Sequence, residues 1–245
     1  MINEQSMKDR IRTIAQKRSI PFNACWKQLL LERFLARLAG STYSHIFIFK
    51  GGFLLSYLMP IGRETMDLDF LLTKMKAGQK EIQGAFEKII SIHSNDGFSF
   101  SFDSMNLLTQ PHMEYPGYRV FLRTTFGKMK DKIQVDVGVG DSVDPLMYKI
   151  PLIEHQGKPL FEETISLHVY PIETIFSEKF EAILSKGTSN SRMKDYHDLM
   201  FLIQGKERLN FSTLKKAITN TFSNRGTIFK PIEFGQLLLP KGRSL

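Results

Sequence analysis

Residues 46–72 read IFIFKGGFLLSYLMPIGRETMDLDFLL, and this stretch decides the fold. Its apolar runs predict short strands over 46–49 and 66–72, separated by a Gly51-Gly52 turn and a helix over 53–59. Alternate side chains of a strand point to opposite faces, so Asp67 and Asp69 share one face. Two neighbouring carboxylates repel each other unless a cation lies between them, and Mg²⁺ prefers such oxygen ligands. The pair therefore indicates a magnesium site.

The paired glycines are the second part of this pattern. They follow Lys50 and precede a helix, so backbone N–H groups at the helix N-terminus can come close to a phosphate. Each part alone is a weak signal, because a solvated Asp-x-Asp strand and a plain Gly-Gly turn are both common.

A third carboxylate, Asp136, lies within the alternating run 133–139. The apolar residues of this run form one face, and Asp136 falls on the other face with Gln134 and Gly138. It can join a metal cluster supplied by a neighbouring strand, as a two-ion phosphoryl transfer requires. Taken alone, the pattern favours an Asp on the solvated face of a half-buried sheet.

The composition is that of a globular protein with a basic excess. The chain has 245 residues, 42% of them hydrophobic, and 33 Lys+Arg against 25 Asp+Glu leave a net charge of +8. This charge favours polyanions such as nucleic acid or nucleotides as partners. A single cysteine, Cys25, excludes an internal disulfide and is expected to be a buried small hydrophobe in a reducing compartment. No apolar segment resembles a signal peptide or a membrane span, so a cytoplasmic protein is expected.

The remaining pattern predicts a mixed α/β part over 1–170 and a helical part over 171–245. Asn23 is expected to cap a helix that ends near Gly40, and 141–159 is expected to be a loop. Periodicity weakens after Gly226. The other predicted helices cover 3–18, 78–93, 172–186, 193–204 and 211–223, and the other strands cover 98–102, 118–126, 132–139 and 166–169.

Lys179 occupies an unexpected place in the helical part. It lies within an apolar stripe, four residues after Ile175 and four before Ile183. A lysine on an inward face either extends to solvent or meets an anion, and a triphosphate would be such an anion.

The next helix carries two acids near its start. Asp195 edges the buried face, although a first-turn acid more often serves the helix dipole. Asp198 is interpreted as such a partner or as a salt-bridge partner of Arg192 or Lys194, and His197 is given no role.

In this order, the pieces resemble the AbiEii/MenT-type nucleotidyltransferase toxins, the toxin half of type IV toxin–antitoxin and abortive-infection systems. The resemblance spans about residues 32–222. The matching segments are 32–38 (ERFLARL), 49–55 (FKGGFLL), 63–70 (RETMDLDF), 134–137 (QVDV), 178–182 (EKFEA) and 192–199 (RMKDYHDL).

The resemblance implies an α+β, polymerase-β-like fold with a mixed sheet and a helical C-terminal part. It also implies roles for individual positions. These are Gly51 and Gly52 as the glycine motif, Asp67 and Asp69 as metal ligands, Asp136 as the third acid, Lys179 as a phosphate ligand and Asp195 as the acid of the last motif.

Two departures from the family pattern stand out. Phe53 follows the glycines where many nucleotidyltransferases have a Ser or Thr whose hydroxyl meets a phosphate, so that contact must come from elsewhere. Family members also usually carry more helix after the last motif.

The expected activity is Mg²⁺-dependent transfer of a nucleotide from an NTP to an RNA, with the tRNA 3′ end as acceptor and an antitoxin as partner. Lys50 joins the phosphate-binding set. Arg119 and Arg123 suit an RNA backbone, but solvated strand residues are the favoured interpretation. Protein nucleotidylation and an inactive nucleotide-binding or antitoxin-docking protein remain alternatives. An Asp-x-Asp phosphatase of the haloacid dehalogenase type fits the glycines and Lys179 poorly.

Overall fold

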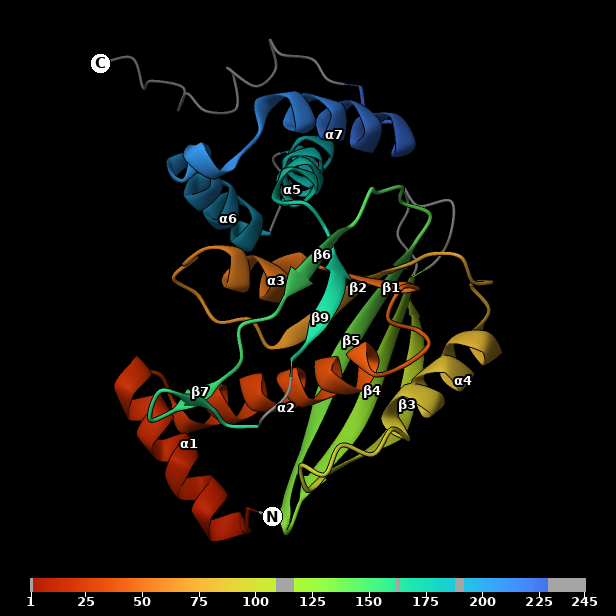
Figure 1. Ribbon diagram of the computed structural model, residues 1–245. Helices are drawn as coiled ribbons and strands as arrows, with labels where there is room; N and C mark the ends of the chain where they lie inside the picture. The colour runs from red at the N-terminus through yellow and green to blue at the C-terminus, as the bar shows by residue number, and fades with distance from the viewer. Residues whose placement is uncertain (1, 109–116, 162–163, 188–191, 229–245) are drawn as a thin grey trace, which may run out of the picture. The chain divides into compact units, whose positions relative to one another are not determined.

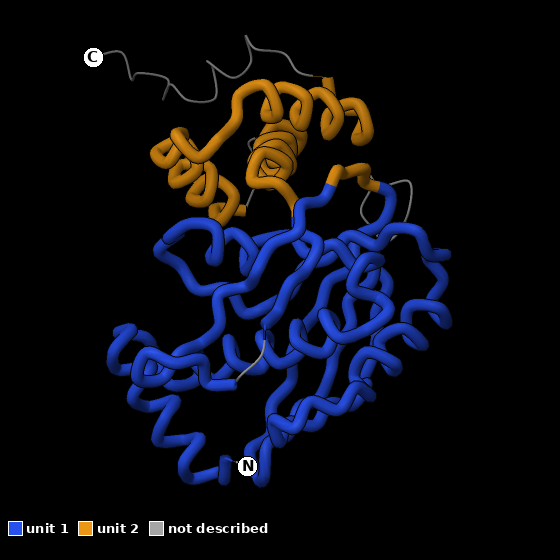
Figure 2. The backbone as a smooth tube through the Cα atoms, viewed as in Figure 1, with its two compact units in different colours: residues 1–140, 145–169 blue, residues 141–144, 170–245 orange. Residues whose placement is uncertain are grey.

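The computed structural model describes residues 2–108, 117–161, 164–187 and 192–228 (Figure 1). The chain divides into two compact units (Figure 2). The first comprises 1–140 and 145–169, and the second comprises 141–144 and 170–245. Most of the weakly periodic stretch after Gly226 lies outside the described residues.

The first unit is built on a seven-stranded mixed sheet of order β3-β4-β5-β2-β1-β9-β6. The central strand β2 is antiparallel to β1 and parallel to β5. This architecture, together with the helices of the second unit, confirms the predicted α+β class with a helical C-terminal part. The strands are β1 (Phe47–Lys50), β2 (Asp67–Leu72), β3 (Phe98–Leu108), β4 (Gly117–Phe126), β5 (Met129–Val139), β6 (Leu146–Lys149) and β9 (Ser166–Val169).

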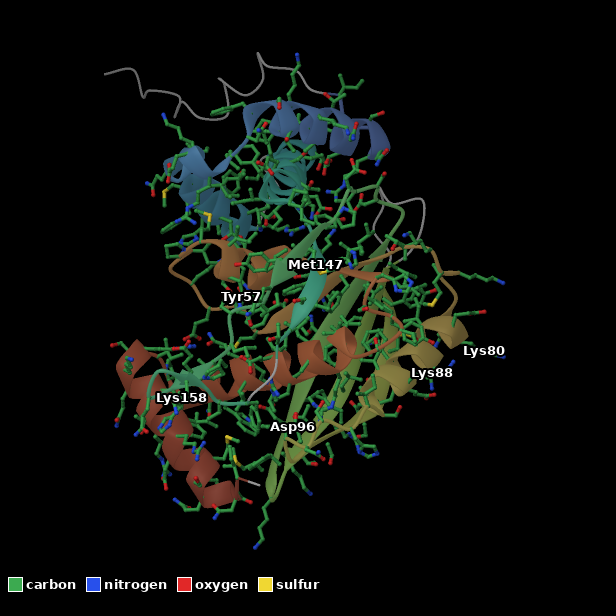
Figure 3. All side chains as sticks on the ribbon, in the orientation of Figure 1. Tyr57, Lys80, Lys88, Asp96, Met147 and Lys158 are labelled. Carbon is green, nitrogen blue, oxygen red and sulfur yellow. The ribbon has the colours of Figure 1, made fainter. Side chains whose placement is uncertain are left out.

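Helices bury the apolar face of the central strands. Phe34 of α2 stacks on Phe86 of α4 with ring centroids 5.8 Å apart, and it also contacts Phe70 of β2. Lys80 and Lys88 extend outward from α4 (Figure 3). Because Phe70 points into this core, the acids of β2 point to the opposite face. The helices are α1 (Glu4–Arg18), α2 (Phe22–Ala39), α3 (Gly51–Leu58) and α4 (Gln79–Ile90).

Three local predictions are wrong. Asn23 lies inside the first turn of α2, and Pro21 takes the cap position. The Gly51-Gly52 pair forms the start of α3 and not a separate turn. The expected loop over 141–159 contains the edge strand β6 and a short hairpin of β7 (Glu154–His155) and β8 (Lys158–Pro159).

The strand β6 escaped the pattern because its apolar residues face outward. Among the described strands it pairs only with β9, and Leu146 and Met147 are 56% and 61% exposed; Met147 is labelled in Figure 3. Alternation of apolar and polar residues marks a half-buried strand, and no residue of β6 is buried. Similarly, β3 continues beyond Phe102, where the sequence predicted its end. A bulge between Phe102 and Ser104 shifts the alternation of its side chains.

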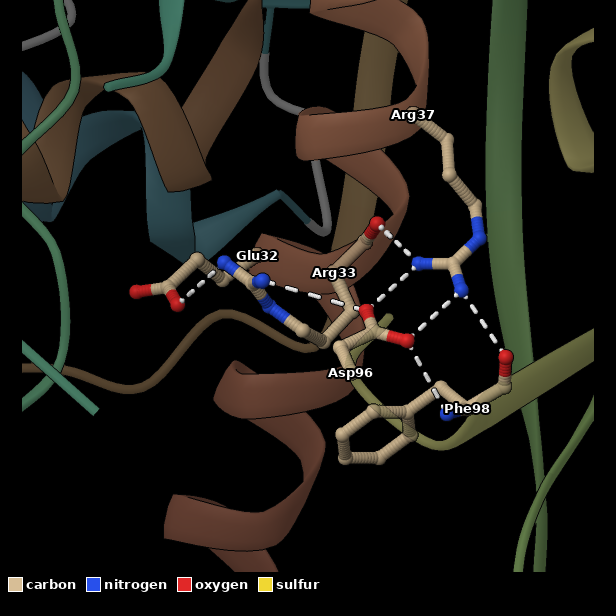
Figure 4. A network of polar contacts seen from close by, with 5 residues as sticks. All are labelled: Glu32, Arg33, Arg37, Asp96 and Phe98. Atoms are coloured by element: carbon tan, nitrogen blue, oxygen red, sulfur yellow. Dashed lines mark hydrogen bonds and ion pairs between the residues drawn. The ribbon is translucent and has the colours of Figure 1, made fainter. Parts of the chain in front are cut away.

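Buried charges tie α2 to the start of β3 (Figure 4). Arg37 donates to both carboxylate oxygens of Asp96 at 2.9 Å, and Arg33 donates to Glu32 at 3.0 Å. Glu32 also accepts from the backbone N–H of Ile153 at 2.5 Å, and burial raises the pKa of this carboxyl. Removing one member of such a buried pair typically costs about 3–5 kcal/mol. The charged residues of segment 32–38 therefore hold the fold.

The second unit contains the helices α5 (Ile172–Lys186), α6 (Met193–Gln204) and α7 (Phe211–Asn224). The rings of Phe180 and Phe222 join α5 to α7, and Arg225 donates to Glu181 of α5 at 2.8 Å. Within the described part of the chain, no helix combines the length and apolarity needed to cross a bilayer.

Candidate active site

The strand β2 presents its two acids on one face of the sheet. Asp67 and Asp69 are half-buried, whereas Leu68 and Phe70 between and beside them are buried. The register of β1 places Lys50 directly opposite Asp69. Lys50 and Asp69 therefore lie side by side at the point where β1 leads into α3.

Gly51 makes room for Asp69. Its φ of +78° lies in the left-handed region, and a Cβ at this position would overlap the Oδ2 atom of Asp69. At Gly52, a Cβ would lie 2.8 Å from Nη2 of Arg63 and 3.2 Å from Oγ1 of Thr65. At Gly51 both the φ and Asp69 thus exclude a Cβ, whereas a Cβ at Gly52 would displace the end of the flexible Arg63 side chain.

A hydroxyl borders the start of α3 even though Phe53 replaces the usual Ser or Thr. Phe53 is buried and packs against Phe49 and Tyr57, so it does not face Gly51 and Gly52 on their outer side. Thr65 lies beside Gly52 instead, and its hydroxyl accepts a hydrogen bond of 2.9 Å from Arg63.

The strand β5 brings Asp136 to the same row as Asp69. In the parallel pairing of β2 with β5, Asp69 is the register partner of Asp136, and Asp67 is the register partner of Gln134. Asp136 is half-buried, while Val135 is buried on the other face, as the alternation predicts. The sheet therefore aligns three carboxylates from two neighbouring strands on one face.

Arg119 of β4 completes the row, and it is not the solvated residue that the sequence favoured. It lies opposite Asp136 in the antiparallel register and donates to it from two nitrogens of the guanidinium. The Nε–Oδ1 distance is 2.9 Å and the Nη2–Oδ2 distance is 2.7 Å. The hydrogen bonds to Asp136 raise the pKa of Arg119, and burial lowers it by a smaller amount. The negative charges of Asp136, Asp67 and Asp69 raise this pKa further. Arg123 pairs instead with Asp103, at 2.5 Å.

The acids of β2 fit a divalent cation in one respect. They offer two carboxylates on one face, next to a glycine whose missing side chain leaves space at Asp69. Mg²⁺ is usually held by one or two carboxylates, with phosphate oxygens and water completing its shell. Across the described ranges, no three His, Cys, Asp or Glu side chains are gathered as a ligand set. Asp67 and Asp69 would therefore hold the ion with the nucleotide, while Asp136 is engaged by Arg119.

Lys179 meets protein carboxylates within the second unit. Its Nζ lies 3.1 Å from Oδ1 of Asp195 and 2.7 Å from Oδ2 of Asp198. Asp198, interpreted from the sequence as a helix-dipole acid or a salt-bridge partner of Arg192 or Lys194, is fully buried and pairs with Lys179. Asp195 is buried too and also pairs with Arg192 at 2.7 Å. Of the two expected alternatives, extension to solvent or pairing with an anion, the structure shows the second, and α6 supplies the carboxylates.

A family model described as nucleotidyl transferase AbiEii toxin, type IV TA system, matches residues 33–243. The chain belongs to this AbiEii family. Its matched span includes every residue of the acidic row and of the Lys179 cluster. A type IV toxin–antitoxin family implies an antitoxin as partner.

Solved structures also resemble this AbiEii chain. The crystal structure of JHP933 from Helicobacter pylori is 17% identical and has a TM-score of 0.49, with 88% of each chain covered. A structure of a candidate nucleotidyltransferase from the same organism is 15% identical with a TM-score of 0.49, covering 89% of this chain and 92% of its own. None of the curated proteins compared matches the sequence.

Arg63, Thr65 and Arg119 are the site residues that sequence reasoning did not assign. Signals for them exist in the AbiEii chain. Thr65 and Arg63 continue the two-residue alternation backwards from Asp67, which places them on its face of an extended segment. The two-residue connection between Phe126 and Met129 fixes the β4–β5 register, and counting back along it places Arg119 opposite Asp136.

Proposed function

We propose that this chain is a Mg²⁺-dependent nucleotidyltransferase toxin that transfers a nucleotide from an NTP to an RNA, with the tRNA 3′ end as the first acceptor to test. The observation that supports this most is the close approach of Asp69 to Gly51, with Asp67 on the same strand face. This arrangement offers carboxylates for a cation and a helix N-terminus for phosphate within one turn of chain.

In the proposed reaction, an acceptor hydroxyl oxygen bonds to the α-phosphorus of the NTP. The bond from that phosphorus to the oxygen bridging to the β-phosphate breaks, and pyrophosphate leaves. A bound Mg²⁺ supplies stabilisation of the charge that develops on the phosphate oxygens. The N–H groups at the start of α3 and the Lys50 ammonium bind and orient the phosphates. Asp136 takes the proton of the acceptor hydroxyl once Arg119 no longer occupies its two oxygens.

The helical unit contributes to this proposal through Lys179 and Asp195. Lys179 stays a predicted phosphate ligand and Asp195 a predicted catalytic acid because of their place in the family pattern. Their pairing within the unit supports a fixed position for the ammonium group.

The deciding experiment incubates the purified chain with Mg²⁺, total tRNA and each α-labelled NTP in turn. The Asp67→Asn/Asp69→Asn variant tests the acids, and Asp9→Asn, on the exposed face of α1, is the matched control. We expect label on tRNA from the wild type and from Asp9→Asn, and a loss of at least about 100-fold in the double variant.

Other results would redirect the proposal. Label on a protein band with none on RNA would make this a protein nucleotidylating enzyme. The pairing of Asp136 with Arg119 favours a second candidate, an inactive nucleotide-binding protein. NTP binding without transfer to any acceptor would establish that second candidate and refute the first.

A further inference from the structure

The third acid of the row already has a cationic partner. Arg119 covers both oxygens of Asp136, and Nε2 of Gln134 donates to Oδ1 at 3.2 Å. The pair is partly shielded from water, with 37% of the Arg119 side chain and 18% of the Asp136 side chain exposed. Bidentate, charge-assisted contacts of this kind are among the stronger hydrogen bonds in proteins. The oxygens that a metal would use are therefore already bonded.

The strand order places this pair directly beside the proposed cation ligands. Asp136 lies between Asp69 on β2 and Arg119 on β4, each in register with it. A cation bound at Asp67 and Asp69 would feel the repulsion of the guanidinium and would compete with it for Asp136.

We propose that Arg119 is a built-in counter-ion that withholds Asp136 from the cation site in the nucleotide-free protein. The inference rests on the proposed function, since it assumes that Asp67 and Asp69 hold a divalent cation. Arg119 acts through Asp136 and is thus a positioning residue. It limits the resting protein to a two-carboxylate site, and Asp136 becomes available when its guanidinium partner turns away.

The test is direct titration of nucleotide-free protein with Mn²⁺, with free Mn²⁺ counted by its paramagnetic resonance signal. Arg119→Gln removes the charge, and we expect it to tighten Mn²⁺ binding by about tenfold. Arg123→Gln is the matched control, because Arg123 lies on the same strand and also pairs with an acid, Asp103, away from β2. It should bind Mn²⁺ as the wild type does.

Two further variants keep the test sharp. Arg119→Gln/Asp136→Asn should return to within about twofold of wild-type affinity, because the gain needs the Asp136 carboxylate. Arg119→Lys keeps a positive charge, so its Mn²⁺ affinity should stay near that of the wild type. This variant tests the role of the charge even if Arg119→Gln does not fold.

The failures can be told apart. Mn²⁺ affinity that is unchanged or weaker in Arg119→Gln, while Asp67→Asn/Asp69→Asn loses binding, would refute the counter-ion and leave the proposed metal site standing. The counter-ion is also refuted if Arg119→Lys binds as tightly as is expected for the glutamine variant. Binding that survives Asp67→Asn/Asp69→Asn would refute the metal site itself, and the counter-ion with it.

Discussion

At the scale of single residues, Gly51 is the position on which the acidic row depends most. Its left-handed backbone and its contact with Asp69 are two separate demands for glycine. The first concerns backbone strain, and the second concerns the position of a carboxylate that is proposed to bind metal.

Gly51→Ala is expected to displace Asp69 and to weaken Mn²⁺ binding by at least about tenfold, because the new Cβ takes the place of the carboxylate oxygen. It should also lower the free energy of unfolding by about 1–2 kcal/mol through the strained φ. Mn²⁺ titration and urea unfolding measure the two effects.

The Gly157→Ala variant separates the effect of backbone strain on stability from the effect of the displaced Asp69 on Mn²⁺ binding. Gly157 has the same φ of +78°, but a Cβ there would meet no atom within 4 Å. We expect a similar loss of stability with unchanged Mn²⁺ binding. Equal loss of Mn²⁺ binding in both variants would show that the effect at Gly51 comes from the backbone and not from Asp69.

At the scale of elements, α5 and α6 are joined by the ion cluster of Lys179, Asp195 and Asp198. The lysine side chain is 12% exposed and the two acids 2% and 0%. Charges so far from water depend on their partners. The cluster therefore makes a structural demand on Lys179 in addition to any role toward nucleotide.

Lys179→Met should lower the free energy of unfolding by about 3–5 kcal/mol, since it leaves buried carboxylates without their ammonium. Lys216→Met in the same unit is the comparison, because its partner Asp144 is 94% exposed at 3.4 Å. That variant should change stability by less than about 0.5 kcal/mol. Urea unfolding without nucleotide measures both free energies of unfolding. A Lys179→Met variant as stable as the wild type would contradict the structural role of Lys179.

The elements differ in how well sequence reveals them. Asp67 and Asp69 could be predicted to share a face because one strand carries both. Asp136 could be placed on the polar face of its own strand. Its position beside Asp69 could not be predicted, because it depends on the parallel pairing of β2 with β5, which no local sequence pattern encodes. The position of Arg119 opposite Asp136 could have been predicted from the hairpin register. The partners of Lys179 could not be predicted, because they come from packing between separate helices.

At the scale of the whole molecule, the excess of basic residues bears on the acceptor. The formal charge of +8 attracts polyanions over the whole surface, whereas the acidic row is local. A protein that contacts several RNA phosphates releases counterions on binding, so its affinity depends steeply on salt.

The affinity for tRNA is therefore expected to fall by at least about 30-fold between 50 and 200 mM salt. Fluorescence anisotropy with labelled tRNA at constant Mg²⁺ measures this. An affinity that hardly changes with salt would contradict an RNA acceptor and would favour a protein acceptor.

The place of β5 in the sheet also has a consequence for the timing of synthesis. Residues 67–72 emerge from the ribosome soon after β1, but their parallel neighbour begins only at Met129. At about 5–20 residues per second, one edge of β2 waits for seconds without its partner. During that interval the nascent chain has Asp67 and Asp69 but neither Asp136 nor Arg119 beside them. The acidic row is therefore completed only after β5 has been made, well after both acids of β2.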